Sequence, residues 1–264
     1  MKFFIASSLC WNYQPRDCLT IAKEHGLAGV ELWAEHIYYH DADPSELREL
    51  AKKNELQLTL HASSWDLNIC SLNKGIQEQS IKELKKSIQL AKKLDVLHMT
   101  FHPGRFTVKS YLQEEHERAL IENTKVLIQE ANEQGVVLSQ ELMEPIPKEM
   151  LTTPEAMNEF LDAVGEGLYV TLDIAHTPLD ESNINYLQQL KRVNSIHLSD
   201  SSKQQYHVPL GEGDVNVDEV LHALSKHSFP IVLEGMDTTE ELHFLNKHLQ
   251  YLTEHEWLER KTST

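Results

Sequence analysis

Eight short apolar runs alternate with longer segments of helical pattern along the 264 residues of the chain. The runs that predict strands cover residues 2–6, 27–33, 56–61, 96–102, 136–141, 168–173, 193–197 and 230–234. The segments that predict helices cover residues 15–25, 44–54, 76–94, 110–134, 154–164, 184–190, 217–225 and 239–257. Strands that alternate with helices become parallel through right-handed crossovers, and eight such units of this size can close into a barrel. We therefore predict an α/β fold, a single (β/α)8 TIM barrel.

The rival fold is an open, doubly wound sheet, which normally has a glycine-rich turn after its first strand. Here the first predicted strand is followed by Ser7-Ser8-Leu9-Cys10-Trp11, which contains no glycine. The composition does not break along the chain. We therefore expect one domain over residues 1–264, with a loose tail from about residue 258.

The balance of charges bears on the class of partner. The chain has 24 Lys and Arg against 41 Asp and Glu, which gives a net charge of −17. Such a charge repels polyanions and weighs against nucleic acid as the partner, although a local basic groove can survive on an acidic protein. No apolar run approaches the ~18 residues that span a bilayer, so we expect no membrane association.

The first residues turn polar too early for the apolar core of a secretory signal, and we interpret them as a strand. Three cysteines, Cys10, Cys18 and Cys70, form neither an even disulfide framework nor a zinc-binding spacing. Both features predict a cytoplasmic protein in a reducing compartment. They leave the oligomeric state open, a homo-oligomer included.

Acids and histidines recur where the predicted strands end. In chain order these residues are Glu31, His61, His102, Glu141, Asp173 with His176, His197 and Glu234, and His207 follows in the loop after the seventh strand. A single histidine at a strand end is more often a hydrogen-bonded rim residue than a ligand. In a barrel, however, the carboxyl ends of all strands face one mouth. Several acids gathered there without a cation would cost several kcal/mol in repulsion and desolvation, so the set indicates a metal site.

The ligand types indicate which ions would bind. Glu141, Asp173, His197 and Glu234 form a hard, oxygen-rich set that suits Mn²⁺, Mg²⁺ or Co²⁺ and also accepts Zn²⁺. His61 and His102 share Glu141 and could hold a second, more zinc-like ion. A third site, from His176 and His207, would have only two ligands.

As an ordered set, these motifs resemble the xylose isomerase-like TIM-barrel superfamily. The resemblance rests on His61 with Asn68, His102-Pro103-Gly104, Gln140-Glu141, Leu172-Asp173-Ile174-Ala175-His176, His197-Leu198-Ser199-Asp200, His207 to Gly213 and Val232-Leu233-Glu234-Gly235. It covers nearly the whole chain. The superfamily includes small sugar isomerases and epimerases, and also the endonuclease IV enzymes of DNA repair.

Similarity to the ketose 3-epimerase branch implies that Glu141 and Glu234 are both metal ligands and the acid–base pair. Asp173 and His197 would complete the metal site, and His176 would contact substrate oxygens. That branch usually has an arginine after the seventh strand, where this chain has Lys203 and His207. A narrow pocket closed by Trp11, Trp33 or Trp65 would favour a sugar as the substrate.

Similarity to the endonuclease IV branch implies three zinc ions. The first would take His61, His102 and Glu141, and the second the four-ligand set of Glu141, Asp173, His197 and Glu234. The third would take His176, His207 and an aspartate two residues before His207, where this chain has Gln205. An amide is a poor replacement for a carboxylate, which puts the third zinc and phosphodiester cleavage in doubt.

The function we predict is metal-dependent isomerisation or epimerisation of a small sugar or polyol-derived ketone through an ene-diolate. Zn²⁺ or Mn²⁺ is the expected cofactor, and Mg²⁺ or Co²⁺ would also serve. The catalytic pair would be Glu141 and Glu234, and Gly235 would leave space for the substrate beside the second carboxylate. The substrate-binding residues would be His176, His207, Lys203, Trp33 and Trp65. One alternative is a zinc phosphodiesterase that acts at abasic sites in DNA, and another is a metal or sugar binder without turnover.

Overall fold

The computed structural model describes residues 1–108 and 111–259. Its eight strands are β1 (Lys2–Ala6), β2 (Gly29–Trp33), β3 (Gln57–His61), β4 (Met99–Phe101), β5 (Leu138–Leu142), β6 (Leu168–Asp173), β7 (Val193–Leu198) and β8 (Pro230–Leu233). Each strand pairs in parallel with the next, and β1 also pairs with β8 from Lys2↔Pro230 to Ile5↔Leu233, which closes the ring. This closure confirms the predicted single (β/α)8 barrel and excludes the open doubly wound sheet.

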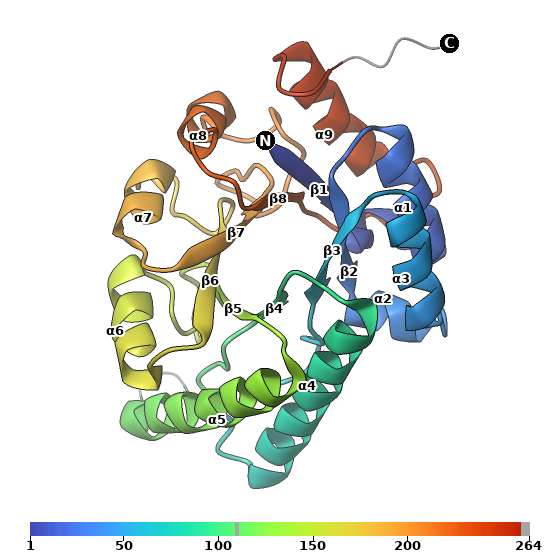
Figure 1. Cartoon of the computed structure of the whole chain (residues 1–264). Coiled ribbons are helices and arrows are strands. Elements are labelled where there is room, and N and C mark those ends of the chain that lie inside the picture. Colours follow the sequence, from blue (N-terminus) through green and yellow to red (C-terminus); the bar gives the residue numbers. More distant parts are fainter. Residues whose placement is uncertain (109–110, 260–264) are drawn as a thin grey trace.

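Helices surround the ring of strands (Figure 1). They are a 3₁₀ helix η1 (Ser7–Cys10) and the α-helices α1 (Pro15–Glu24), α2 (Ala34–Tyr39), α3 (Pro44–Lys53), α4 (Lys74–Leu94), α5 (Gln113–Gln134), α6 (Pro154–Val164), α7 (Asn183–Gln189), α8 (Val217–Leu224) and α9 (His243–Glu254). Several helix starts, among them those of α3 and α6, follow the capping signals of the sequence. Asp43 accepts a hydrogen bond from Ser45 N (2.8 Å), and Thr153 Oγ1 accepts one from Ala156 N (3.2 Å). No helix of the described part combines the length and the hydropathy needed to cross a bilayer.

The two faces of each strand have different surroundings. Val170 and Leu172 of β6 belong to the large apolar core that packs between strands and helices. Because side chains alternate along a strand, Thr171 and Asp173 point to the inside of the barrel. One side of this interior is apolar, with Phe4, Ala6 and Val232 packed together near Ala28 and Trp33.

The other side of the barrel interior is polar. Thr171 Oγ1 lies 2.9 Å from Thr100 Oγ1 and 2.7 Å from Ser139 Oγ, and Ser139 donates a hydrogen bond to Asn194 Oδ1 (2.7 Å). These hydroxyl groups form hydrogen bonds with one another and with Asn194, so a polar layer can lie inside the barrel. This polar layer lies directly beneath the strand-end acids and histidines at the mouth of the barrel.

Two short elements near the mouth were not predicted, η1 and α2. Helix α2 follows β2 directly, and its N-cap residue Trp33 makes no side-chain cap hydrogen bond. The helix buries Ala34, His36 and Ile37 instead. Tertiary packing therefore forms this helix where the sequence has no start signal.

Some predicted boundaries were wrong. The predicted last helix begins at residue 239, but α9 begins at His243. Asp237 is the reason, because its carboxylate accepts hydrogen bonds from Thr239 N (2.8 Å) and Phe244 N (2.9 Å) and folds the preceding residues into a turn. The predicted helix start at residue 110 and residues 260–264 of the predicted tail lie outside the described residues.

Candidate metal centre

The four residues of the oxygen-rich set come from four consecutive strands of the barrel. Glu141 lies in β5, Asp173 ends β6, His197 lies in β7, and Glu234 follows β8 directly. Asp173 and His197 are register partners in the β6–β7 pair. Glu234 N donates a hydrogen bond to Leu198 O (3.1 Å), which continues the β8 ladder by one residue and keeps this carboxylate at the mouth.

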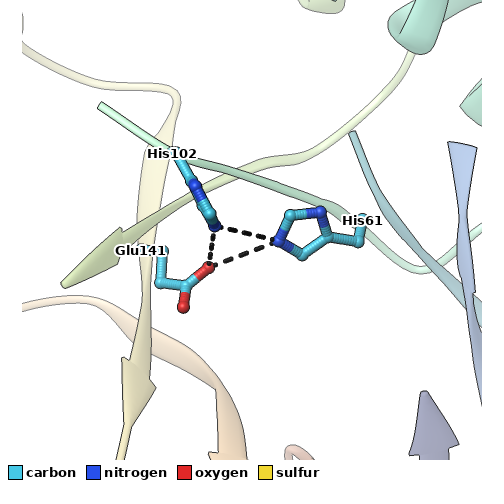
Figure 2. A group of neighbouring side chains, drawn as sticks. All are labelled: His61, His102 and Glu141. Atoms are coloured by element: carbon cyan, nitrogen blue, oxygen red, sulfur yellow. Dashed lines mark hydrogen bonds and ion pairs between the residues drawn. The ribbon is translucent and has the colours of Figure 1, made fainter. Parts of the chain in front are cut away.

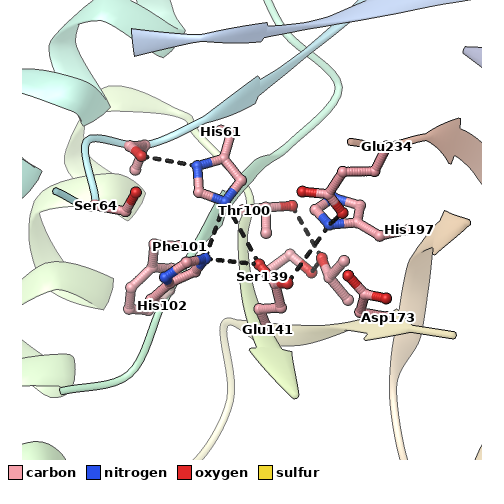
Figure 3. Close-up of polar contacts among 12 residues, drawn as sticks. His61, Ser64, Thr100, Phe101, His102, Ser139, Glu141, Asp173, His197 and Glu234 are labelled. Carbon is pink, nitrogen blue, oxygen red and sulfur yellow. Dashed lines mark hydrogen bonds and ion pairs between the residues drawn. The ribbon is translucent and has the colours of Figure 1, made fainter. Parts of the chain in front are cut away.

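These four side chains converge inside the barrel (Figure 3). One ligand atom from each lies within 4.8 Å of the corresponding atoms of the others. His197 Nδ1 is 2.8 Å from Glu234 Oε2 and 3.6 Å from Glu141 Oε1. All four residues are buried, and Glu234 is the most exposed at 6%. The structure thus gathers the predicted four-ligand set in a space that one cation could bridge.

Several of the converging atoms lack other partners. Glu141 Oε2, Asp173 Oδ2, Glu234 Oε2 and His197 Nδ1 are buried and make no hydrogen bond of favourable geometry to the described residues. The second oxygen of Asp173 is held in place, because Oδ1 accepts a hydrogen bond from Ala175 N (2.7 Å). Buried carboxylate oxygens without partners are costly, and a divalent cation would satisfy all of them together. The residues present therefore fit a divalent metal ion.

A second group adjoins the first through Glu141 (Figure 2). His61 Nε2 lies 3.2 Å from His102 Nε2, and Glu141 Oε2 is 3.5 Å and 3.1 Å from these two nitrogens. His61 Nδ1 faces the Ala62 carbonyl oxygen at 2.9 Å, so Nδ1 carries the proton and Nε2 can offer its lone pair. The opposite oxygen of Glu141 faces His197, so this carboxylate bridges both groups. Two imidazoles and one carboxylate form a set typical of zinc.

The third group differs from the expectation of only two ligands. His176 Nε2 lies 3.2 Å from His207 Nε2 and 3.6 Å from Asp173 Oδ2, so Asp173 joins the two histidines. Glu144 Oε2 is also 3.5 Å from His176 Nε2. Gln205 is exposed, and its amide donates to the His207 carbonyl oxygen at 3.5 Å. The carboxylates of this group therefore come from β6 and the loop after β5, and Gln205 takes no part in it.

The loop between β7 and α8 folds around one buried acid, Asp200. Its carboxylate accepts hydrogen bonds from the backbone N–H groups of Ser201, Gly211, Gly213 and Val215 at 2.8–3.0 Å. A Cβ atom at Gly213 would lie only 2.2 Å from Asp200 Oδ1, so the loop requires glycine there. The amides of Gly211 and Gly213 are thus committed to the carboxylate of Asp200.

The same loop positions His207 at the mouth. Asp200 and Val208 form an antiparallel bridge, with N···O distances of 3.0 and 2.8 Å. Ser199 Oγ lies 2.9 Å from His207 Nδ1, which directs Nε2 of His207 toward His176. A histidine far from the strand in sequence thereby reaches the third group.

The predicted substrate-binding residues occupy different positions at the mouth. The ring of Trp33 stacks on His61, with centroids 4.4 Å apart. Trp65 is 52% exposed and packs against Trp11, with centroids 5.2 Å apart. Lys203 is exposed at the tip of a turn closed by Ser202 N and Gln205 O (2.9 Å). The tryptophans thus border the mouth near β2 and β3, and Lys203 lies across it in the loop after β7.

Gly235 has a structural reason besides the predicted space for substrate. A Cβ atom there would lie 2.6 Å from the ring of Phe244 in α9. The positive φ of 155° also favours glycine.

Two acids at the mouth have contacts that the sequence analysis did not assign. Glu144, three residues after Glu141 and next to Pro145, approaches the third group. Glu31 was placed among the strand-end residues without a role, and its Oε1 lies 3.0 Å from His197 Nε2. An acid at an inward position of β2 was the available signal for Glu31, while nothing in the spacing distinguished Glu144 from a loop acid.

In the metal-free site, neighbouring carboxylates and imidazoles stabilise one another's charged forms. Burial raises the pKa of Glu141, but nearby His102 and His197 outweigh burial and hold it well below its usual range. Burial lowers the pKa of His61 and His176, but the surrounding carboxylates raise both to about 9. Burial raises the pKa of Asp173 to about 6. In the absence of metal, protons on the histidines therefore compensate part of the negative charge.

Metal affinity is expected to rise between about pH 6.5 and pH 9. His61 holds a proton below a pKa of about 9, and a zinc ion can bind its Nε2 atom only after that proton leaves. The apparent affinity should therefore increase by about tenfold per pH unit for each proton released. Calorimetric titration with Zn²⁺ in buffers of different ionisation enthalpy counts the released protons.

The contacts between His61 and the surrounding carboxylates also affect the stability of the metal-free protein. Unlike metal affinity, this stability falls as the pH rises. A raised histidine pKa stabilises the fold fully below the unfolded value of 6.5, and this contribution is lost as the pH rises through about 9. In His61→Ala, the number of protons released by Zn²⁺ should fall by about one. A zinc affinity that does not change over this pH range would contradict the assignment of the histidines as ligands.

Comparison with known proteins places the chain among TIM barrels. The family model described as xylose isomerase-like TIM barrel matches residues 19–261. An uncharacterized protein of Methanocaldococcus jannaschii is 30% identical over 179 residues, which cover 67% of this chain and 70% of that protein. A D-psicose 3-epimerase of Enterocloster bolteae is 25% identical over 206 residues, which cover 72% of this chain and 67% of the epimerase.

Among solved structures, a D-tagatose 3-epimerase-like protein has a TM-score of 0.80 to this chain at 22% sequence identity. The alignment covers 97% of this chain and 100% of that protein. At this level of identity the likeness extends to the fold, and the two barrels share it over their full length.

Proposed function

The chain belongs to the xylose isomerase-like TIM-barrel family, and from this premise we propose that it is a divalent-metal-dependent epimerase or isomerase of a small sugar or polyol-derived ketone. One observation carries the proposal. Two buried carboxylates from different strands, Glu141 and Glu234, approach the same nitrogen of His197 at 3.6 and 2.8 Å. Such a pair offers two proton acceptors around one substrate position. The similarity to the D-psicose 3-epimerase of E. bolteae supports the same class of reaction. The proposal treats residues 1–264 as one domain.

Glu234 and Glu141 would carry out the proton transfers. Glu234 would take the proton from the carbon beside the substrate carbonyl, and the electron pair of that C–H bond would form the double bond of an ene-diolate. Glu141, after taking up a proton from solvent, would deliver it to the opposite face of the same carbon, which inverts the configuration. Glu234 would then release the abstracted proton to solvent. Each step at the carbon moves one proton between carbon and carboxylate, so no oxidant or reductant is needed. When bound, a divalent cation would supply Lewis-acid stabilisation of the negative charge on the substrate oxygens.

Other residues at the mouth would bind and orient the substrate. His176 and His207 present Nε2 atoms to the mouth and would contact substrate oxygens. Trp33 and Trp65 would pack against carbon-bound faces of the sugar, and Lys203 would contact an oxygen at the rim. Both glutamates are buried, which would limit the access of water to the reacting carbon.

The donor sets support two ions of different preference. Glu141, Asp173, His197 and Glu234 would hold the ion of the reaction, and three carboxylates with one imidazole suit Mn²⁺, Co²⁺ or Mg²⁺ and accept Zn²⁺. His61 and His102 would hold a second, zinc-like ion that shares Glu141. Ligand distances near about 2.0–2.3 Å are expected for both.

A zinc phosphodiesterase that acts at abasic DNA is the second candidate function. The approach of Asp173 to His176 and His207 favours it, because this third group keeps a carboxylate although Gln205 replaces an aspartate. The net charge of −17 weighs against it, since a polyanion would be repelled. We therefore place the epimerase first.

An assay of both substrate classes tests the proposal. Protein loaded with Mn²⁺ or Zn²⁺ is expected to interconvert ketohexoses or ketopentoses that are epimers at the carbon next to the carbonyl, as followed by chromatography. The same preparation should leave an abasic DNA duplex intact, and Gln205→Asp should raise any residual nicking. Efficient nicking with Zn²⁺ and no turnover of any ketose would reverse the order of the two candidates.

A further inference from the structure

Glu31 is a buried acid outside the three ligand groups. It lies in β2, which β1 and β8 separate from β7 in the closed ring, and its exposed fraction is 0%. Its Oε1 atom lies 3.0 Å from His197 Nε2 as an ion-pair contact, and neither of these two buried atoms makes a hydrogen bond of favourable geometry to the described residues. Its Oε2 atom accepts a hydrogen bond from Thr59 Oγ1 (3.0 Å). The side chain therefore extends through the barrel interior to His197, a proposed metal ligand. It approaches the ring nitrogen that faces away from Glu141 and Glu234.

The residues beside Glu31 in the barrel fit this reach. In the strand register, Glu31 pairs with Ala6 of β1 on one side and with Thr59 of β3 on the other. Register partners in parallel strands point to the same face, so all three side chains face inward. The small side chain of Ala6 leaves room for the glutamate, and the hydroxyl group of Thr59 fixes one of its oxygens. The carboxylate is thus directed at a single target.

That target has two nitrogens in different surroundings. His197 Nδ1 faces the ligand oxygens of Glu234 and Glu141, while Nε2 faces Glu31 alone among these acids. A carboxylate at one nitrogen of an imidazole keeps the proton on that nitrogen and makes the other a stronger electron donor. A buried acid without such a role would be expensive to keep inside a barrel, since an apolar residue would pack there at lower cost.

We propose that Glu31 is a positioning residue for the metal centre. Its carboxylate holds the proton of His197 on Nε2, so that Nδ1 becomes the ligand atom. The inference rests on the proposed metal function, and it adds a residue that determines the affinity and orientation of the ion without touching it. Thr59 supports the glutamate in turn. The chain Thr59–Glu31–His197 thereby connects β3, β2 and β7 through the barrel interior.

Binding of Mn²⁺ alone tests the inference without any substrate. Free Mn²⁺ is counted by electron paramagnetic resonance during titration of the metal-free protein. Glu31→Leu and Glu31→Gln should weaken binding, by about 10–100-fold for the leucine variant and less for the glutamine variant, whose amide oxygen can still accept the Nε2 proton. Thr59→Val should cause a smaller loss, because Glu31 remains but is less well fixed.

Ser195→Ala is the matched control. Ser195 is fully buried in β7 two residues before His197, and its hydroxyl group has no hydrogen-bond partner among the described residues. Its removal should leave Mn²⁺ binding unchanged, while a general disturbance of β7 would weaken it. If Glu31→Leu does not fold, the glutamine and Thr59 variants still carry the test.

A second readout separates positioning from packing. The second readout is NMR of Zn²⁺-loaded protein labelled with ¹⁵N at histidine. In the unchanged chain, His197 Nε2 should give the ¹H–¹⁵N signal of a protonated ring nitrogen, and its proton should exchange slowly with water. In Glu31→Leu this proton should exchange faster, and Glu31→Gln should restore part of the protection. Equal exchange in all three proteins would overturn the positioning role.

The outcomes also distinguish this inference from the proposed function. If the unchanged protein binds Mn²⁺ and Glu31→Leu binds it equally well, only the role of Glu31 is wrong. If the unchanged protein binds no divalent metal, both the metal centre and the role of Glu31 are wrong.

Discussion

Glu234→Gln is expected to reduce exchange of the substrate's carbon-bound hydrogen with solvent by about 10²–10⁴-fold while most of the metal stays bound. Glutamine keeps the volume of the side chain and one potential ligand oxygen, but it cannot accept the proton. The substitution should affect the reaction and not the fold. The backbone of Glu234 continues the β8 ladder, and its side chain is buried, with 6% exposed. The fold should therefore survive the substitution. Deuterium incorporation into the ketose and bound metal are both measured on one preparation.

Glu141→Gln should reduce exchange in the same way, because the proposed mechanism needs a carboxylate on each face of the carbon. Glu149→Gln is the control, since Glu149 lies in the loop after β5, pairs with Arg105 at 4.0 Å and belongs to none of the ligand groups. A purely structural role of Glu234 gives a different pattern, in which exchange falls only as far as metal occupancy falls. That pattern would show that the two-glutamate mechanism is wrong.

The barrel could be predicted because its signals are local and repeated. In β6, apolar residues alternate with inward-facing ones up to Asp173, and the predicted run of 168–173 matches the strand. Pro44 and Pro154 mark helix starts with a fixed φ, and both helices begin there. Eight repetitions of this pattern leave few arrangements other than a closed ring.

Short elements without such signals could not be predicted. Helix α2 is six residues long and forms because Ile37 and His36 are buried, a tertiary effect that no local pattern reports. The late start of α9 depends on Asp237, whose carboxylate binds amides on both sides of a turn. An acid before a helical pattern is ordinarily a simple N-cap. The additional hydrogen bond from Phe244 N to Asp237 therefore could not be predicted from the sequence.

The residues of the candidate metal centre could be predicted in part from strand ends alone. Residues that close neighbouring parallel strands must share the mouth, and Glu141, Asp173 and His197 lie together for that reason. Side-chain direction was beyond the sequence. The division of Glu141, with Oε1 toward His197 and Oε2 toward His102, depends on rotamers, as does the approach of Asp173 to His176.

Metal removal is expected to have an effect on activity at least as large as the loss of either glutamate. Without a cation, the negative charge that develops on the substrate oxygens would meet the buried carboxylates of the four-ligand set, so the barrier should rise by an amount worth at least about 10²-fold in rate. The fold should also become less stable, because an ion at 100 times its dissociation constant contributes about 2.7 kcal/mol. Thermal unfolding with and without chelator measures this second effect.

The central claim is that the strand-end acids and histidines form a metal centre at which two glutamates exchange a substrate proton with solvent. Deuterium incorporation into a ketose in D₂O tests it most directly, with one protein preparation measured after chelator treatment and again after Mn²⁺ or Zn²⁺ is returned. The account predicts incorporation at a single carbon next to the carbonyl, which disappears with the chelator and returns in proportion to bound metal. Incorporation that continues at the same rate in metal-free protein would contradict it.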